Sequence, residues 1–240
     1  MIAKAIDKII GLARPTTVTV NDNQYSTVPL TRVAKEIRAD DPLEVATLTS
    51  FVRYIKDFKE NFKDFTPLLL HVVSPTRVEL TTALDSDRRR ETLMIAEAEI
   101  PRIPFGKYID NEQMLITVQS MFIDDPETDR AAVLKFAGTV TSGSIKEYGD
   151  DGVTQKATIK QGVASKAEGI VPSPCVLRPF RTFAEVEQPA SKFIFRMRDT
   201  RDEVEAALFE ADGGAWKNEA RENIRKYLEK QVGVLVTVIS

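Results

Sequence analysis

The strongest constraint on the fold lies near the C-terminus, where apolar and polar residues alternate along two neighbouring stretches. In Lys192–Asp199 the odd positions hold Phe193, Phe195 and Met197, while basic residues fill most of the even positions. In 203–209 the even positions are apolar, and the first two odd positions are glutamates. Because successive side chains of a strand point to opposite faces, each stretch is predicted to be a strand with one buried face.

A two-residue loop at Thr200-Arg201 would join these strands as an antiparallel hairpin. This loop sets Arg198 opposite Glu203 and Arg196 opposite Glu205, and it pairs apolar residues on the other face. Opposite charges and apolar pairs fall into place together, so this register is the predicted one. It assigns the basic face mainly to internal ion pairs.

A helix and a last strand are predicted to follow the hairpin. Asp212-Gly213-Gly214 leads into a helix over 215–230 with a mostly apolar inner stripe, and Gly233 ends it. Val234–Ile239 is a β-branched run typical of a buried strand. Strand, helix and strand would form a right-handed crossover if the last strand were parallel to its neighbour.

The rest of the chain predicts helices and strands without an internal repeat. Helical signals lie at Ile2–Leu12, Asp40-Asp41-Pro42, Leu48–Phe62, Asn111–Phe122 with Asp110 as its cap, and Arg130–Phe136. Strand signals lie at Thr16–Val20, Gln24–Val28, Pro67–Val73, Arg77–Leu84 and Thr92–Ile100.

Residues 138–167 differ in character, because Gly, Ser, Thr and Lys dominate and no clean apolar face is present. We expect a long polar β-hairpin that leans on the rest of the chain or on another copy, since a hairpin alone is marginal in water. The predicted fold is α+β, with antiparallel hairpins, short strands and four to five packed helices. No linker is evident, so we expect a single domain over 1–240, with 138–167 as a protruding arm.

Composition excludes several classes of site. The 240 residues include one cysteine, which excludes an intramolecular disulfide framework and a zinc site built from cysteines. The formal net charge is −3, so nucleic-acid binding would need a local basic patch. No run approaches the roughly 18 apolar residues of a membrane span, and charged residues interrupt the apolar pattern at the N-terminus. We expect a cytoplasmic protein without a cofactor or membrane contact.

The residues that could support catalysis or bind a metal ion have simpler interpretations. His71 is the single histidine and lies in an apolar run, which favours an ordinary strand residue over a general base or ligand. Cys175 lacks a surrounding catalytic motif, so a packed thiol is favoured. The doublets Asp40-Asp41, Asp124-Asp125 and Asp150-Asp151 precede Pro or Gly, where aspartate forms turns and caps. We therefore predict no catalytic and no metal site.

Two groups of residues are candidates for contact with an anion or a nucleic acid. Gly213 and Gly214 precede a helix and could offer backbone N–H groups to a phosphate, although a tight turn is the simpler interpretation. The basic candidates have no evident acidic partners in the sequence and include arginines interleaved with phenylalanines, a combination that suits phosphate contact and base stacking. They are Arg88, Arg89, Arg90, Arg178 and Arg181.

Three stretches carry a resemblance to a known family. They are Cys175–Arg198 (CVLRPFRTFAEVEQPASKFIFRMR), the helix Thr47–Phe62 with its core LTSFVRYI, and the turn Asp212–Trp216 (DGGAW). Together they resemble the YfdQ-like family of phage and prophage proteins, a domain of unknown function, from about Leu43 to the C-terminus. The resemblance implies a viral origin and a role inside the infected bacterium, and it carries over no functional residue.

These observations favour a non-enzymatic phage accessory protein that acts as a homo-oligomer in the cytoplasm of the bacterial host. One alternative is a nucleic-acid-associated protein of phage replication or recombination that uses the Arg178 and Arg181 region. A second alternative is a binder of a small anionic signalling molecule, such as a nucleotide, that counters host defence. The expected partner is another copy of the chain, or a nucleic acid or nucleotide in the alternatives.

Overall fold

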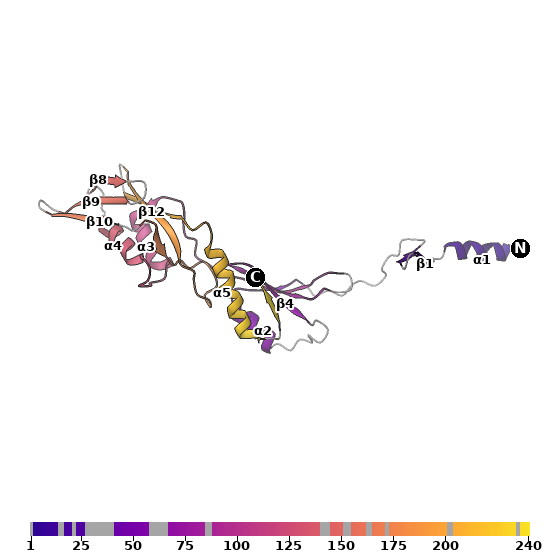
Figure 1. Ribbon diagram of the computed structural model, residues 1–240. Helices are drawn as coiled ribbons and strands as arrows, with labels where there is room; N and C mark the ends of the chain where they lie inside the picture. Colours follow the sequence, from indigo (N-terminus) through magenta and orange to yellow (C-terminus); the bar gives the residue numbers. More distant parts are fainter. Residues whose placement is uncertain are drawn as a thin grey trace. The chain divides into compact units, whose positions relative to one another are not determined.

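The computed structural model describes residues 2–13, 17–20, 23–26, 41–57, 67–84, 88–139, 145–150, 155–161, 165–170, 173–200, 204–233 and 236–240 (Figure 1). The predicted α+β class is confirmed, with five helices and antiparallel or mixed sheets in these residues. The single domain over 1–240 stays a prediction. The chain consists of two compact units, residues 1–38 and 39–240.

The first unit contains one helix and one hairpin, both at the positions that the sequence predicts. Helix α1 spans Ile2–Ala13, and strands β1 (Thr17–Val20) and β2 (Asn23–Ser26) pair antiparallel, with Val18 opposite Tyr25. A helix of this length is marginal in water, and so is a two-stranded hairpin. Neither element is therefore expected to be stable by itself.

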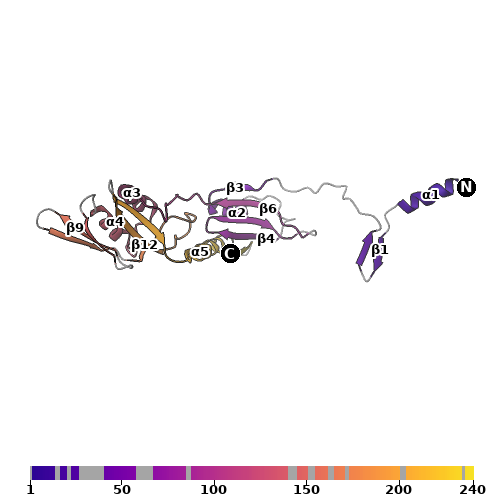
Figure 2. The ribbon, with the colours of Figure 1, turned by 90° about the horizontal axis from the view of Figure 1, so that it is seen from above.

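The second unit contains a mixed sheet of five strands in the order β14-β4-β5-β6-β3 (Figure 2). The central strands β4 (Leu68–Ser74), β5 (Arg77–Thr82) and β6 (Thr92–Glu97) are antiparallel, and all three are predicted correctly. The short edge strands β3 (Leu43–Val45) and β14 (Thr237–Ile239) run parallel to β6 and β4.

Helices α2 (Leu48–Asp57) and α5 (Trp216–Val232) supply the other side of this sheet's core. The buried residues alternate along the strands and recur every three or four positions in the helices, as expected for a half-buried sheet under amphipathic helices. They include Leu48, Phe51, Leu70, Val72, Val78, Leu80, Met94, Ile224 and Leu228.

The expected helix start at Asp40-Asp41-Pro42 is wrong. Pro42 leads into β3, and α2 begins only at Leu48. The Oγ1 atom of Thr47 accepts a hydrogen bond from the N–H of Ser50 at 3.3 Å, so a threonine caps this helix. A proline suits the first residue of a strand as well as the first turn of a helix, which explains the error. Residues 58–62 of the predicted helix lie outside the described residues.

A second, wholly antiparallel sheet has the order β11-β12-β13-β7. Its strands are β7 (Ile109–Asp110), β11 (Cys175–Leu177), β12 (Ser191–Asp199) and β13 (Val204–Glu210). Helices α3 (Asn111–Met121) and α4 (Arg130–Thr139) lie beside β12 and share its core (Figure 2). As predicted, Asp110 caps α3, and its Oδ1 accepts from the N–H of Gln113 at 2.9 Å.

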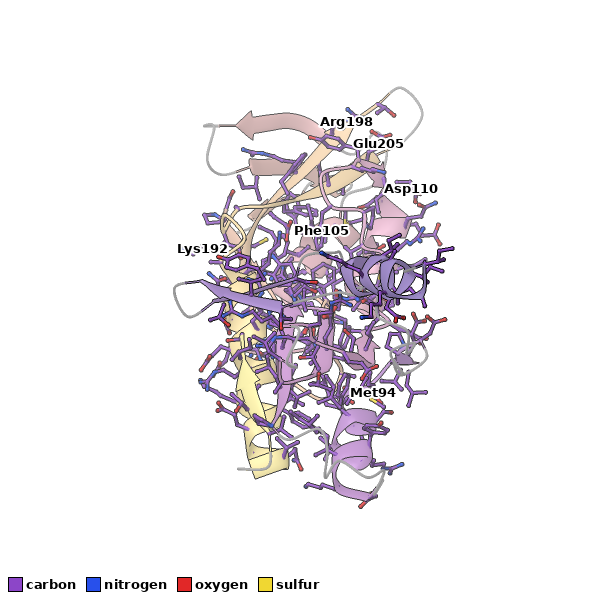
Figure 3. The ribbon with its side chains drawn as sticks, turned by 90° about the vertical axis from the view of Figure 1, so that its right-hand side faces the viewer. Met94, Phe105, Asp110, Lys192, Arg198 and Glu205 are labelled. Atoms are coloured by element: carbon purple, nitrogen blue, oxygen red, sulfur yellow. The ribbon has the colours of Figure 1, made fainter. Side chains whose placement is uncertain are left out.

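The predicted register of the β12–β13 hairpin is wrong by two residues. Asp199 is the last residue of β12 to pair, with Val204, so the loop spans 200–203 and is longer than two residues. Arg198 consequently lies opposite Glu205, to which it forms an ion pair (Figure 3), and Arg196 lies opposite Ala207. A shift of two residues leaves each side chain on its face of the sheet, so the predicted buried face is correct.

The predicted order of hairpin, helix and strand at the C-terminus is confirmed, but these elements do not share one sheet. The hairpin belongs to the four-stranded sheet, whereas β14 is parallel to β4 in the five-stranded sheet. Helix α5 has 17 residues and is therefore about 25 Å long. It carries the chain from one core to the other, so no crossover within a single sheet arises.

Three strands between residues 145 and 170 form a third sheet of the second unit, where the sequence predicts a hairpin over 138–167. Strands β8 (Ile145–Asp150), β9 (Gln155–Gln161) and β10 (Ser165–Ile170) are antiparallel in the order β10-β9-β8. The third strand is the difference from the prediction. Residues 138 and 139 belong to α4. Strand β10 contacts α4, so this sheet packs against another element of the same chain.

Candidate functional site

The segment between β11 and β12, residues 178–190, contacts both cores of the second unit. It leaves the core of the four-stranded sheet and inserts Phe183 into the core of the five-stranded sheet. The hydroxyl of Thr182 donates to the carbonyl oxygen of Pro75, in the turn between β4 and β5. Glu185 reaches α2, where its Oε1 accepts from the N–H of Thr49 at 3.0 Å. We call residues 178–190 the clamp segment.

One buried glutamine folds the clamp segment back on itself. The Oε1 atom of Gln188 accepts from the backbone N–H groups of Arg181 and Thr182 at 2.9 and 3.1 Å. Its Nε2 donates to the carbonyl oxygen of Phe183 at 2.9 Å. A buried backbone amide without a partner destabilises a fold, so this one side chain satisfies groups that no strand or helix pairs.

Arg181 is the centre of the clamp segment and is only 4% exposed. Its Nη1 donates to Oε1 of Glu210 at 3.0 Å, and its Nη2 donates to the hydroxyl of Ser191. Its guanidinium carbon lies 3.9 Å from the centre of the Trp216 ring and 5.7 Å from that of Phe193, which are cation–π geometries. Burial lowers the pKa of Arg181 to about 10, and Glu210 opposes that shift, so the side chain is charged at neutral pH.

Arg178 also forms ion pairs with carboxylates of the chain. Its Nη1 lies 3.2 Å from a carboxylate oxygen of Asp125 and 3.2 Å from one of Glu187. The expectation that Arg178 and Arg181 have no acidic partners is therefore wrong. Asp125 and Glu210 are distant in sequence, so only the fold brings them to these arginines.

The two candidate glycines form a tight turn, in line with the simpler interpretation. Gly213 and Gly214 have φ angles of +64° and +81°, in the left-handed region that glycine tolerates. The carboxylate of Asp212 accepts from the N–H of Gly214 at 2.9 Å and from that of Trp216 at 3.3 Å. The backbone N–H groups of Gly214 and Trp216, which could have bound an anion, therefore already bind a carboxylate of the chain itself.

The structure divides the seven candidates between two places. Arg181 and the glycine turn come together around Trp216, with Arg178 in the same clamp segment. Arg88, Arg89 and Arg90 are exposed and lie between β5 and β6 of the five-stranded sheet. Within that loop, Nη1 of Arg90 donates to the carbonyl oxygen of Thr82 at 3.0 Å.

The residues with possible catalytic or metal chemistry have ordinary environments. His71 is exposed on β4, opposite Glu79. Cys175 is buried, its Sγ donates to the carbonyl oxygen of Phe193 at 3.3 Å, and burial raises its pKa to about 12, so it is a packed thiol. Asp125 accepts from the N–H of Glu127 at 2.9 Å, which is the predicted turn. No group of three potential metal ligands occurs among the described residues.

The most unusual surface is one that sequence reasoning missed, the apolar face of α1. Ile2, Ile6, Ile9 and Ile10 are 78%, 49%, 66% and 49% exposed. We call these four residues the isoleucine stripe. The spacing of the stripe predicts one helical face, and the described strands of the first unit leave that face exposed. In the following hairpin, the paired side chains of Val18 and Tyr25 are also exposed.

No protein-family model, curated protein or solved structure matches the chain. Within the described residues, no helix combines the length and apolarity that crossing a bilayer requires. The string Cys175–Arg198 forms β11, the clamp segment and most of β12. Its contacts connect the two cores, so that string has a structural explanation that requires no ligand.

Proposed function

We propose that this chain is a non-enzymatic, phage-encoded accessory protein that acts as a homo-oligomer inside the infected bacterium. The observation that carries the proposal is the isoleucine stripe of α1, which the other described residues of the first unit leave exposed. The phage origin and the setting in the host cytoplasm rest on the resemblance of Cys175–Arg198 to the YfdQ-like family.

Burial of the isoleucine stripe supports assembly energetically. Full burial of one isoleucine side chain stabilises a structure by about 1.5–3 kcal/mol, and the stripe contains four such side chains. Loss of translational and rotational freedom on association costs roughly 4–15 kcal/mol. The two free energies are of similar size, so each isoleucine of the stripe contributes a decisive part of the free energy of assembly. A short helix also gains from a partner the stability that it lacks alone.

The chemistry of α1 favours another copy of the chain over a lipid surface. Helices that lie on membranes usually have a strongly basic polar face and Trp, Phe or Leu on the apolar face. Here the polar face carries Lys4, Asp7 and Lys8, and the stripe is entirely isoleucine. β-Branched aliphatic side chains in a regular stripe suit packing against identical helices.

The two alternatives receive less support from the geometry. The guanidinium groups of Arg178 and Arg181 already contact carboxylates of the chain. The backbone N–H group of Gly214 is bound to Asp212. Among the candidate residues, this leaves the exposed loop 88–90 for contact with a nucleic acid, which is a small basic patch on a chain of net charge −3.

Light scattering coupled to gel filtration tests the proposal. We expect a mass that is a multiple of 26.8 kDa and that falls towards 26.8 kDa on dilution. A mass of 26.8 kDa at every protein concentration would exclude the homo-oligomer. Binding to single- and double-stranded DNA across a salt series gives the complementary result, since salt-dependent binding would favour the nucleic-acid alternative.

A further inference from the structure

We propose that the clamp segment is a strap that couples two lobes of the second unit into one cooperative body, and that release of Phe183 uncouples them. The five-stranded lobe is the five-stranded sheet with α2 and α5, and the four-stranded lobe is the four-stranded sheet with α3 and α4. This inference goes beyond the proposed function and is independent of it, because it concerns contacts within residues 39–240.

Each lobe has a hydrophobic core of its own. The buried residues of the described ranges form two clusters that share no residue, one under each sheet. The chain passes between the lobes twice, through residues 98–108 and at the start of α5. A body with its own core can open separately from its neighbour, and it does so unless contacts between the two oppose the opening. The contacts of the clamp segment therefore decide whether the lobes behave as one body.

Backbone and charged groups fix the clamp segment to the four-stranded lobe. The N–H of Ile123 donates to the carbonyl oxygen of Arg178 at 2.8 Å, and the N–H of Phe180 donates to that of Met121 at 3.0 Å. The buried guanidinium of Arg181 adds its hydrogen bonds to β12 and β13. Hydrogen bonds that involve a charged group are stronger than neutral ones. The first residues of the clamp segment are therefore expected to stay with the four-stranded lobe.

Phe183 is the main contact of the clamp segment with the five-stranded lobe. It is 1% exposed and lies in that lobe's core, although the strands on either side of the clamp segment, β11 and β12, belong to the other core. Hydrogen bonds of Thr182 and Glu185 accompany it, and Nδ2 of Asn223 in α5 donates to the carbonyl oxygen of Glu187 at 3.1 Å. Burial of an aromatic ring contributes more to stability than a hydrogen bond exchanged with water. The coupling therefore depends chiefly on Phe183.

Native-state hydrogen exchange of the full chain, measured separately on peptides from β4–β6 and from β12–β13, tests the strap. In the native protein we expect the slowest amides of both sheets to have the same protection factor, because the lobes open together. Phe183→Ala should lower the protection of β4–β6 by at least about tenfold more than that of β12–β13. Phe51→Ala removes the same side chain from the same core but leaves the clamp segment intact, so it should lower both by the same factor. Phe183→Leu is the milder variant if Phe183→Ala does not fold.

The outcomes separate a strap from an ordinary core residue. An unequal loss of protection in the Phe183 variant, with an equal loss in Phe51→Ala, supports the strap. Equal losses in both variants would make Phe183 an ordinary core residue, and unequal losses in both would assign the effect to damage of that core. Either result overturns the proposal. So does unequal protection of the two sheets in the native protein, because the lobes would then open separately with the clamp segment in place.

Discussion

Helices α1 and α2 carry the same kind of sequence pattern and have opposite environments. Both place apolar residues three and four positions apart. In α2, Leu48 and Phe51 are 0% exposed, whereas in α1, Ile2 and Ile9 are 78% and 66% exposed. The five-stranded sheet covers α2, whereas the described residues of the first unit offer α1 only a two-stranded hairpin. An amphipathic pattern therefore predicts that a face will be buried, and it does not say in which molecule.

The largest expected effect is a difference in the free energy of unfolding between a substitution in α2 and one in α1. We expect Phe51→Ala in α2 to lower the free energy of unfolding of the second unit by about 3–5 kcal/mol, because it opens a cavity in a closed core. Ile9→Ala in α1 should change that free energy by less than about 0.5 kcal/mol. Urea denaturation of both variants measures the difference. Equal losses would mean that α1 packs on the second unit.

The next prediction compares substitutions of a buried arginine, Arg181, and an exposed one, Arg90. Arg181→Ala should destabilise the second unit by about 1–3 kcal/mol, because it leaves the buried hydroxyl of Ser191 without its donor and removes the cation–π contact with Trp216. Arg90→Ala, on the exposed loop, should cost less than about 1 kcal/mol. Thermal denaturation would show both. If Arg181→Ala left stability unchanged but abolished binding to DNA, the nucleic-acid alternative would replace our account of this residue.

A pH dependence should distinguish the buried thiol from an exposed one. Burial raises the pKa of Cys175 from 9.0 to about 12, so between these values the folded state holds a proton that the unfolded state releases. Stability from this group is complete below about pH 9 and falls as pH rises towards 12. Urea denaturation across this range measures the fall, and Cys175→Ala should remove that part of the slope. An unchanged slope in Cys175→Ala would assign the effect to other groups.

The smallest effect concerns the contact between the clamp segment and α2. Oε1 of Glu185 accepts from both the N–H and the hydroxyl of Thr49, at 3.0 and 3.2 Å. Glu185→Ala should therefore lower the free energy of unfolding by about 1 kcal/mol, as for loss of a helix cap. Glu99→Ala, at an exposed position outside any strand, provides the control and should be nearly neutral. A neutral Glu185→Ala would show that the clamp segment does not stabilise α2.

Local periodicity predicts much of the fold because its causes are local. The alternation in Lys192–Asp199 fixes the buried face of β12, and Asp110 marks the start of α3 through its own side chain. The register of the β12–β13 hairpin was not predictable in the same way. Charge pairing fits a two-residue loop, whereas the strands pair only as far as Asp199 and Val204.

The candidate site was harder to predict because it depends on contacts between distant residues. Arg181 meets Glu210, and Arg178 meets Asp125, only in the folded chain. From the sequence alone, such arginines resemble a binding patch. The isoleucine stripe presents the opposite difficulty. Its pattern is visible in the sequence, but its exposure beside the described hairpin of the first unit becomes apparent only when the side chains are placed.

The most direct test of self-assembly through α1 is the mass of two matched variants in solution by light scattering. Ile6→Asp places a charge in the isoleucine stripe, and Lys4→Asp places the same side chain on the polar face of the same helix. The account predicts a multiple of 26.8 kDa for the native protein and for Lys4→Asp, and 26.8 kDa for Ile6→Asp. An Ile6→Asp variant that stays assembled, or a native protein of 26.8 kDa at every concentration, would contradict it.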